Sequence, residues 1–400
     1  MNNETRKETQ VLPKDVRYVG ADDLTLPLFE NQYPVQPMGV SYNSYLILDE
    51  KIAVMDSVDA RAADEWLAKL AHELDGRRPD YLVISHMEPD HSGSILRLAE
   101  KYQEMKLVGN TKTFTMLRQF FGAKAPTDDR LLEVGEGETL PLGAHTLHFM
   151  LAPMVHWPEV MVAYEETEKI LFSADAFGRF GALSRTAGAP WAPQARRYYY
   201  NIVGKYGAQV QALLKKASAL EIKTVCPLHG PVLTGEALGE ALRLYDLWSR
   251  WQSESPDDIL LAHASIHGNT ARAAELLKQK LEAKGARVTL CDLTTTEVSY
   301  AVANAFYCGR LVLACSTYDG GLFPPMEEFL SHLQAKGFRD RSVGLMENGS
   351  WAPAAARLMR AKLEEMKDLR VCGTVVSLRS AFGPANEAQM EALSAELCAK

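Results

Sequence analysis

The sequence predicts an α/β protein of two domains, and three observations lead to this fold class. The chain has 400 residues, of which 47% are hydrophobic and 24% charged, so it is long enough to form two cores. A short polar stretch, residues 253–258, interrupts the apolar pattern. Strands with antiparallel character dominate before it, and strands and helices alternate regularly after it. We therefore expect one domain over residues 1–254 and a second over residues 255–400.

The first domain is expected to be a largely antiparallel β-sandwich that also contains helices. Apolar alternation and short apolar runs predict strands of a largely antiparallel sandwich at residues 40–48, 52–55, 146–151, 160–164 and 170–172. A further apolar run at residues 81–85 also ends as a strand would. Helical periodicity predicts helices at residues 60–74, 94–102, 113–121 and 194–217.

The second domain is expected to be a doubly wound parallel sheet of the flavodoxin kind. Strands are predicted at residues 259–264, 288–293, 311–315, 342–346 and 371–377. Helices are predicted at residues 269–284, 298–305, 325–335, 354–366 and 386–399. Five strand–helix units in about 140 residues are the signature of such a sheet.

Charge and composition exclude several classes of partner. The formal net charge is −8, and no long basic run occurs, which disfavours a nucleic-acid partner or an anionic membrane surface. Residues 1–15 are polar, and no stretch has the ~20 consecutive apolar residues that a membrane span requires, so we expect a cytoplasmic protein. The six cysteines form no Cys-x-x-Cys pair, which argues against a disulfide framework, a zinc knuckle or a fused rubredoxin module.

A cluster of histidines and carboxylates predicts a metal centre in the first domain. His86, Glu88, Asp90 and His91 directly follow the apolar run at residues 81–85, where a strand that ends abruptly can point them into one small space. Each of the other candidates follows a further apolar strand: His156, Asp175 and His229. Four imidazoles and three carboxylates suffice for two metal ions with positions left open for a substrate.

Charge and ligand type favour iron as the metal. Two divalent ions carry four positive charges, the three carboxylates offset three of them, and a bridging hydroxide can offset the last. Mixed imidazole and carboxylate ligands are usual for non-haem iron, which also has redox chemistry. Zinc accepts the same ligands, so a dinuclear zinc site remains an alternative at this point.

Together these motifs resemble the flavodiiron proteins, also called A-type flavoproteins. The resemblance rests on His-x-Glu-x-Asp-His at residues 86–91, His-Trp-Pro at 156–158, Asp175, Leu-His-Gly-Pro at 228–231 and Met-Gly-Val-Ser-Tyr-Asn-Ser-Tyr at 38–45. It implies a metallo-β-lactamase fold, an αββα sandwich, for the first domain, and it extends from about residue 16 to the C-terminus. Related hydrolases normally have a histidine at the position of Glu88, which makes this residue the most discriminating one.

The resemblance also implies a role for each candidate ligand. The ligands of one iron would be His86, Glu88 and His156. The ligands of the other would be Asp90, His91 and His229, with Asp175 as the bridge between the irons. In some members of the family, water displaces the histidine equivalent to His91 from the metal.

A flavodiiron protein requires a site for flavin mononucleotide (FMN), and the second domain offers one. Residues 265–270 follow the first strand and open a helix, where small and hydroxyl side chains suit a phosphate, although such a loop could also be a simple capped turn. Residues 316–324 resemble the isoalloxazine-binding segment of the family, and residues 347–353 offer a second wall. The expected contacts are Ser265, His267, Gly268, Asn269, Thr270, Ser316, Thr317, Tyr318, Asp319, Gly320, Asn348, Gly349, Ser350 and Trp351. The three loops converge at the carboxyl edge of the sheet, where open α/β sheets bind ligands.

The resemblance implies an oxidoreductase in which FMN passes electrons from a donor to the two irons. The substrate would be O2, reduced to water, or NO, reduced to N2O, and the ligands do not choose between them. We expect a separate donor protein, rubredoxin by resemblance, and a head-to-tail homodimer. Two other classes stay open: a dinuclear zinc hydrolase with an accessory flavodoxin domain, and an electron carrier whose metal domain is structural.

Overall fold

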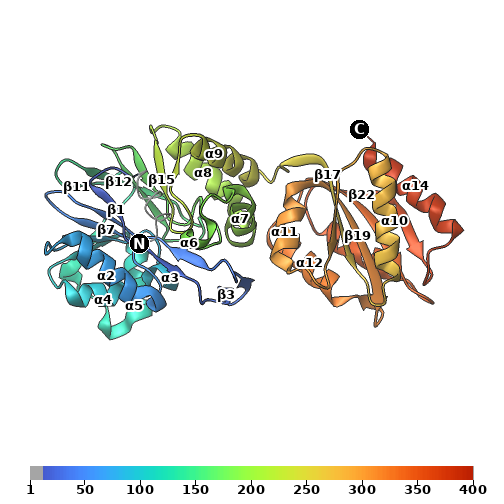
Figure 1. Cartoon of the computed structure of the whole chain (residues 1–400), viewed down its shortest axis with the longest axis horizontal. Helices are drawn as coiled ribbons and strands as arrows, with labels where there is room; N and C mark the ends of the chain where they lie inside the picture. The colour runs from blue at the N-terminus through green and yellow to red at the C-terminus, as the bar shows by residue number, and fades with distance from the viewer. Residues whose placement is uncertain (1–11, 400) are drawn as a thin grey trace. The chain divides into compact units, whose positions relative to one another are not determined.

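The computed structural model describes residues 12–399, and the chain divides into two compact units, Met1–Asp246 and Leu247–Lys400 (Figure 1). Residues 1–11 and 400, at the ends of the two expected domains, lie outside the described residues. The division falls inside helix α9 (Gly235–Ser249), upstream of the polar stretch at residues 253–258. None of the helices within residues 12–399 combines the length and apolar character that a membrane span needs.

The first unit contains two six-stranded sheets. The first sheet has the order β1 (Val16–Tyr18), β6 (Tyr45–Ile47), β7 (Ala53–Met55), β8 (Tyr81–Val83), β9 (Lys106–Gly109) and β10 (Leu131–Glu133). The second has the order β11 (Thr139–Pro141), β12 (Thr146–Leu151), β13 (Met161–Glu165), β14 (Ile170–Phe172), β15 (Thr224–Cys226) and β16 (Leu233–Thr234). The short pairs β2 (Ala21–Asp23) with β5 (Val40–Tyr42), and β3 (Leu28–Phe29) with β4 (Tyr33–Pro34), lie outside both sheets.

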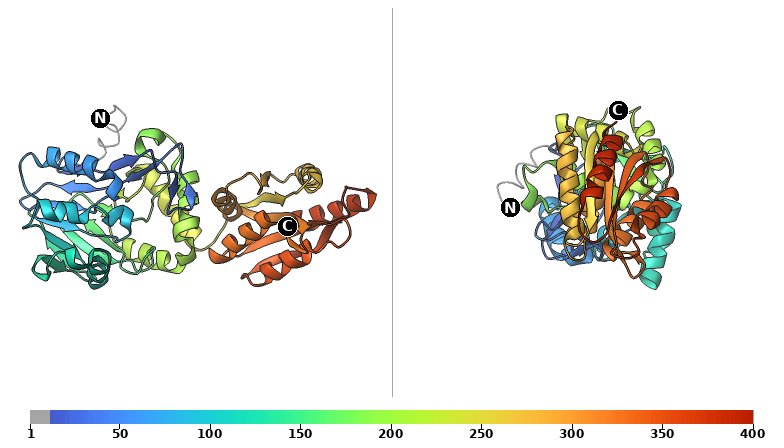
Figure 2. Two further views of the ribbon diagram at one scale, coloured as in Figure 1. Left: turned by 90° about the horizontal axis from the view of Figure 1, so that it is seen from below. Right: turned by 90° about the vertical axis from the view of Figure 1, so that its right-hand side faces the viewer.

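The two sheets pack face to face over one buried core. Ile47 and Val83 contribute to it from the first sheet, and Phe149 and Phe172 contribute from the second. Helices cover the outer faces, with α2 (Ala63–Leu74), α4 (Ile95–Lys101) and α5 (Thr111–Phe121) on one side and α8 (Gly207–Ala217) and α9 on the other (Figures 1 and 2). This αββα sandwich confirms the fold class predicted for the first domain, because each sheet buries one face against its partner and the other against helices.

The first sheet is mixed, so the prediction of a largely antiparallel sandwich is wrong for this half. Strands β7, β8, β9 and β10 are parallel to one another. The helices α2 (Ala63–Leu74), α4 (Ile95–Lys101) and α5 (Thr111–Phe121) supply the crossover connections that parallel neighbours require. Parallel strands bring their carboxyl ends to one edge of the sheet, and the residues that follow β8 lie there.

Two predicted elements of the first unit are interrupted. The strand expected at residues 40–48 breaks at Asn43, whose side-chain amide donates to the carbonyls of Pro227 and Gly230 at 2.8 Å each. The helix expected at residues 194–217 is divided into α7 (Trp191–Tyr198), a π-helical turn (Tyr199–Val203), a 3-10 turn (Gly204–Tyr206) and α8 (Gly207–Ala217). Gly204 and Gly207 lower the helix propensity at this point. The Asn43 contacts tie the first sheet to the loop that carries His229.

The second unit contains a sheet with five parallel strands in the order β18 (Val288–Asp292), β17 (Ser255–Ala264), β19 (Cys308–Tyr318), β21 (Arg341–Asn348) and β22 (Leu369–Leu378). The two-residue strand β20 (Gly321–Leu322) pairs antiparallel with β19. Its helices are α10 (Asn269–Ala283), α11 (Val298–Tyr307), α12 (Pro324–Ala335), α13 (Ala355–Glu364) and α14 (Pro384–Cys398). Helices α10 and α14 contact each other, as do α11 and α12 (Figure 1). This order confirms the flavodoxin-like sheet predicted from the sequence.

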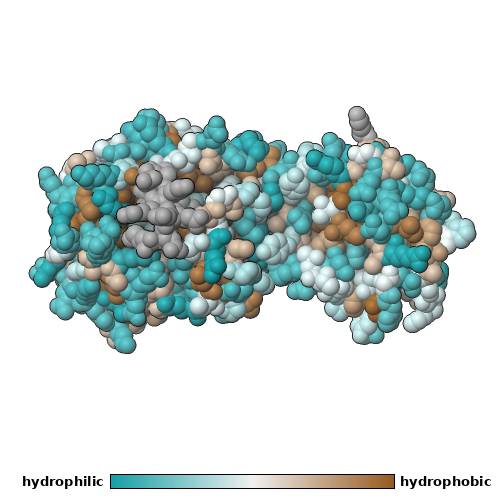
Figure 3. Space-filling model, in the orientation of Figure 1, coloured by the Kyte–Doolittle hydropathy of each residue, from teal (hydrophilic) through white to brown (hydrophobic). Residues whose placement is uncertain are grey.

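The core of the second unit leaves few large apolar side chains exposed. Leu277 of α10 and Leu393 of α14 pack with Val312 of β19 in one buried cluster. On the face seen in Figure 3, hydrophilic residues predominate and hydrophobic ones are scattered among them. Two of the large hydrophobic residues that are exposed are Tyr318 and Trp351, which belong to the loops at the carboxyl edge of the sheet. The carboxyl edge of the sheet is therefore the candidate ligand-binding region of this unit.

Candidate metal centre and cofactor pocket

The ends of strands position the candidate metal ligands. His86 and Glu88 lie between β8 and the short helix α3 (Pro89–Ser92), which contains Asp90 and His91. The sequence predicted a loop here, but Pro89 opens a helical turn, because its missing N–H is not needed at the start of a helix. His156 lies between β12 and β13, Asp175 follows β14 and His229 follows β15.

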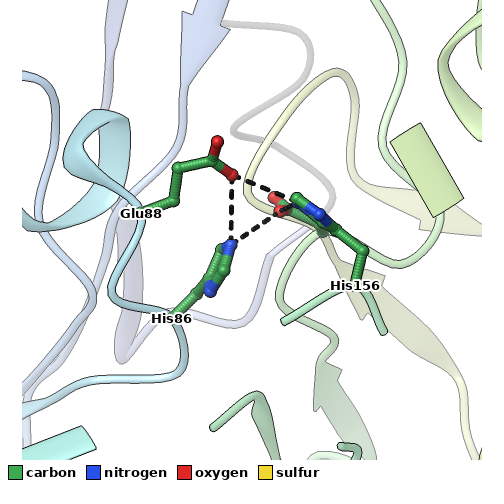
Figure 4. A group of neighbouring side chains, drawn as sticks. His86, Glu88 and His156 are labelled. Atoms are coloured by element: carbon green, nitrogen blue, oxygen red, sulfur yellow. Dashed lines mark hydrogen bonds and ion pairs between the residues drawn. The ribbon is translucent and has the colours of Figure 1, made fainter. Parts of the chain in front are cut away.

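The structure brings the seven predicted side chains together as two groups that flank Asp175. The Glu88 group consists of His86, Glu88 and His156 (Figure 4). Within it, Oε2 of Glu88 lies 3.2 Å from Nε2 of His86 and 3.1 Å from Nε2 of His156. One carboxylate and two imidazoles thus point their ligand atoms at the same small space.

The Asp90 group consists of Asp90, His91 and His229. Its two imidazoles face each other, with 3.1 Å between Nε2 of His91 and Nε2 of His229. Oδ2 of Asp90 lies 3.3 Å from Nε2 of His91 and 3.2 Å from Nε2 of His229. The composition of this group matches that of the Glu88 group.

Asp175 is fully buried and turns one carboxylate oxygen to each group. Its Oδ2 lies 3.3 Å from Nε2 of His86 and 3.1 Å from Nε2 of His156. Its Oδ1 lies 3.2 Å from Nε2 of His91 and 3.6 Å from Nε2 of His229. A carboxylate in this position can bridge two ions.

The donor atoms fit two cations. Both carboxylate oxygens of Asp90 and Oδ1 of Asp175 are buried and accept no hydrogen bond. Buried polar atoms without a partner are costly, and a coordinated cation would satisfy them. The facing ring nitrogens of His91 and His229 suit a cation in the same way, because neutral imidazole nitrogens are common metal ligands.

Burial and close charges shift the pKa values of the cluster. Burial alone would lower the pKa of His156, but hydrogen bonds to Asp175 and Glu88 outweigh it and raise this pKa to about 9. Burial alone would raise the pKa of Asp175, but the charge of His91 and the hydrogen bond from His156 hold it well below the usual value. The carboxylate of Asp175 is therefore held in the ionised form that binds metal.

Two residues near the centre, Glu159 and Glu30, were not predicted from the sequence. Glu159 accepts a hydrogen bond from Nδ1 of His86 at 2.7 Å, and its place directly after residues 156–158 was the available signal. Glu30, at the end of β3, is exposed as a residue, but desolvation of its carboxyl and the negative charge of Glu88 raise its pKa to about 7. No motif in the sequence pointed to Glu30.

A pocket of about 610 Å³ lies in the second unit, at the carboxyl edge of the parallel sheet. Of the expected FMN contacts, all except Gly268 line this pocket: Ser265, His267, Asn269, Thr270, Ser316, Thr317, Tyr318, Asp319, Gly320, Asn348, Gly349, Ser350 and Trp351. Gly268 caps the start of α10 instead, with a φ of +87° that favours glycine. Ile266, Ala352 and Ser380 complete the lining.

The chemistry of this pocket suits a phosphate and a planar ring. The hydroxyls of Thr270 and Ser316 lie 2.8 Å apart and are buried, next to the backbone N–H groups at the start of α10. The lining contains no lysine or arginine, so an anion would be held by hydroxyls and backbone amides. Tyr318 is 44% exposed and Trp351 is 88% exposed, so each offers an aromatic face for stacking.

The loop after β22 holds the Trp351 loop in place. The side chain of Asn348 and the backbone of Ser380 exchange two hydrogen bonds, of 2.9 and 3.1 Å. The hydroxyls of Ser350 and Ser380 lie 2.7 Å apart, and Arg379 donates to the carbonyl of Trp351 at 3.0 Å. The fifth strand thus supports the second wall of the pocket.

Comparisons with known proteins agree with both units. A family model described as "ODP family beta lactamase" matches residues 40–230. The rubredoxin-oxygen oxidoreductase of Megalodesulfovibrio gigas is 28% identical over 358 residues, covering 87% of this chain and 87% of that protein. A nitric oxide reductase of Moorella thermoacetica is 27% identical over 361 residues, covering 88% of each. The crystal structure of the flavodiiron protein from Giardia intestinalis matches with a TM-score of 0.89 and 26% identity, over 97% of this chain and 95% of that chain. These matches span both units, and the chain therefore belongs to the flavodiiron protein family.

Proposed function

We propose that this protein is an oxidoreductase that reduces O2 to water, NO to N2O, or both, at a non-haem diiron centre, with electrons delivered through FMN. The observation that carries the proposal is the pair of ligand groups that share Asp175. Relatives named as an oxygen oxidoreductase and a nitric oxide reductase support the same activity.

The chain's own residues would hold the metal. The Glu88 group would hold one iron, the Asp90 group the other, and Asp175 would bridge them through its two oxygens. Two irons supply electrons one at a time and open positions for a diatomic gas. The fully buried imidazoles of His86, His91 and His229 keep bulk water away from the centre, which strengthens each interaction with the ions.

The second unit would hold FMN. The start of α10, with the hydroxyls of Thr270 and Ser316, would bind the phosphate, and Tyr318 and Trp351 would flank the ring. Two electrons on FMN and two on the irons would together match the four that reduction of O2 to water requires.

The zinc hydrolase is the weaker alternative. In the Glu88 group, Glu88 stands where related hydrolases have a histidine, and an added carboxylate favours iron over zinc. The relatives named as reductases match over most of this chain, whereas the lactamase description concerns residues 40–230 only. Metal analysis that finds zinc, together with ester or lactam hydrolysis, would restore the hydrolase.

We further infer a separate donor protein such as rubredoxin and a head-to-tail homodimer, both in line with the family resemblance. The dimer would bring the FMN of one chain to the irons of its partner. Sedimentation should therefore report a dimer, and donor-linked turnover per chain should fall on dilution into the monomer range. A monomer that retains full turnover at high dilution would contradict the dimer.

Rapid mixing of the reduced protein with each gas tests the proposed activity. The protein is reconstituted with iron and FMN, reduced fully without oxygen, and mixed with O2 or NO in a stopped-flow spectrometer. We expect one O2 consumed per four electrons without peroxide, or one N2O formed per two NO. The proposal would be overturned if the reduced protein is not oxidised by either gas, or if it is oxidised only as slowly as free reduced FMN.

A further inference from the structure

Glu159 lies behind the candidate metal centre and is not one of its seven ligands. It lies two residues before the start of β13 and is 1% exposed. A carboxylate so deeply buried is costly unless hydrogen bonds compensate it. Its compensating contacts therefore indicate what the residue does.

One oxygen of Glu159 accepts two hydrogen bonds from the ligand loop. Oε1 lies 2.7 Å from Nδ1 of His86 and 2.9 Å from the backbone nitrogen of Met87. In Figure 4 one ring nitrogen of His86 points toward Glu88 and the other points away from it. The contact with Glu159 places the proton on Nδ1, so that Nε2 presents its lone pair to the Glu88 group.

The backbone of Glu159 is anchored as well. Its carbonyl accepts a hydrogen bond from Nδ2 of Asn110 at 2.7 Å. The side-chain oxygen of Asn110 caps helix α5 through the backbone N–H groups of Lys112 and Thr113, at 3.0 and 3.1 Å. The carboxylate is thus fixed relative to a helix as well as to β13, which suits a group that orients another side chain.

Among residues 12–399, no carboxylate takes the place of Glu159 beside the Asp90 group. Nδ1 of His229 bonds to the neutral backbone carbonyl of Ser41 at 2.7 Å. Nδ1 of His91 is buried and has no hydrogen-bond partner. Each group has one carboxylate of its own, and Asp175 turns one oxygen to the imidazoles of each group, so a charged outer partner distinguishes the Glu88 group from the Asp90 group.

We propose that Glu159 is a positioning residue that makes the Glu88 group the tighter-binding of the two ion sites. An outer carboxylate fixes the tautomer of a metal-binding imidazole and raises its basicity, whereas a peptide carbonyl does so less strongly. The inference rests on the proposed two-iron centre. It adds that the two irons are inequivalent and names the residue responsible.

The test is release of iron from the reconstituted protein to a chelator. Wild-type protein should release its two irons in two phases, with the slower phase from the Glu88 group. Glu159→Gln keeps the size and an acceptor oxygen but removes the charge. It should speed the slow phase about 10- to 100-fold, the usual cost of losing such a partner, and leave the fast phase unchanged.

Glu165→Gln is the matched control. Glu165 is fully buried at the other end of β13 and accepts from the backbone nitrogens of Thr167 and Glu168 at 2.9 and 2.7 Å. Its loss should leave both phases as in wild type. Refilling the fast site with 57Fe should give a Mössbauer doublet that Glu159→Gln leaves unchanged, whereas the doublet of the slow site should shift.

Each outcome decides one question. A wild-type chain that retains fewer than two irons would count against the proposed function itself. Release of both irons in a single phase by wild-type protein would overturn the role of Glu159, even if Glu159→Gln does not fold. Equal release and equal spectra of Glu159→Gln and Glu165→Gln would overturn it as well.

Discussion

Replacing Asp175 by asparagine should abolish retention of two irons while the fold persists. The side chain keeps its size, but the charge that faces both ligand groups is lost. Removing one partner from a buried charge pair typically costs about 3–5 kcal/mol. At about 1.4 kcal/mol per factor of ten, this corresponds to a loss of roughly 140- to 4,000-fold in iron affinity.

The assay is reconstitution with ferrous iron under anaerobic conditions, followed by gel filtration and metal analysis per chain. Asp49→Asn is the control, because Asp49 also pairs with an imidazole, that of His145 at 2.9 Å, and none of the seven ligands is involved. The control should retain two irons. Asp175→Asn that binds two irons with wild-type affinity would refute the bridging role.

Three further predictions concern stability and flavin. Gly230→Ala should destabilise the protein by about 1–3 kcal/mol in chemical unfolding, because φ is +79° and the new Cβ would lie 2.7 Å from Cγ of Arg179. Gly239→Ala is the control and should not destabilise the protein, because Gly239 lies within α9 with open space around it. Burial lowers the pKa of His263, so the unfolded chain takes up a proton at a higher pH than the folded one, and the free energy of unfolding should fall as pH drops below about 6.5. Wild type should therefore lose more stability between pH 7.5 and 5.5 than His263→Gln. Equal losses in the two proteins would contradict this prediction. Thr270→Val should weaken FMN binding about 10-fold in fluorescence titrations, and unchanged affinity would place the phosphate elsewhere.

The sequence predicted the second unit better than the first, for a physical reason. Strands such as β17 and β19 are long, buried and separated by regular helices, so their periodicity is clear. Strand β15 has three residues, which is too few to show a period, so the sequence predicted an apolar strand before His229 but not its bounds. The parallel half of the first sheet escaped because pairing direction depends on which helices act as crossovers.

The clustering of the seven candidate ligands was predictable because each carries its chemistry in its own residue type and lies after an apolar strand. The roles of Glu159 and Ser380 could not be predicted from the sequence, because they depend on residues that are distant in the chain. Glu159 matters through its contact with His86, and Ser380 lines the pocket because β22 lies beside β21 in the sheet. Such contacts need the tertiary structure.

Anomalous diffraction from crystals of the iron-loaded protein tests the central claim most directly. Data collected just above and just below the iron absorption edge should give two peaks that vanish below the edge. One peak should lie among the side chains of the Glu88 group and the other among those of the Asp90 group, with Asp175 between them. A single peak or no peak would contradict a diiron centre. So would peaks whose height does not change across the iron edge but rises across the zinc edge.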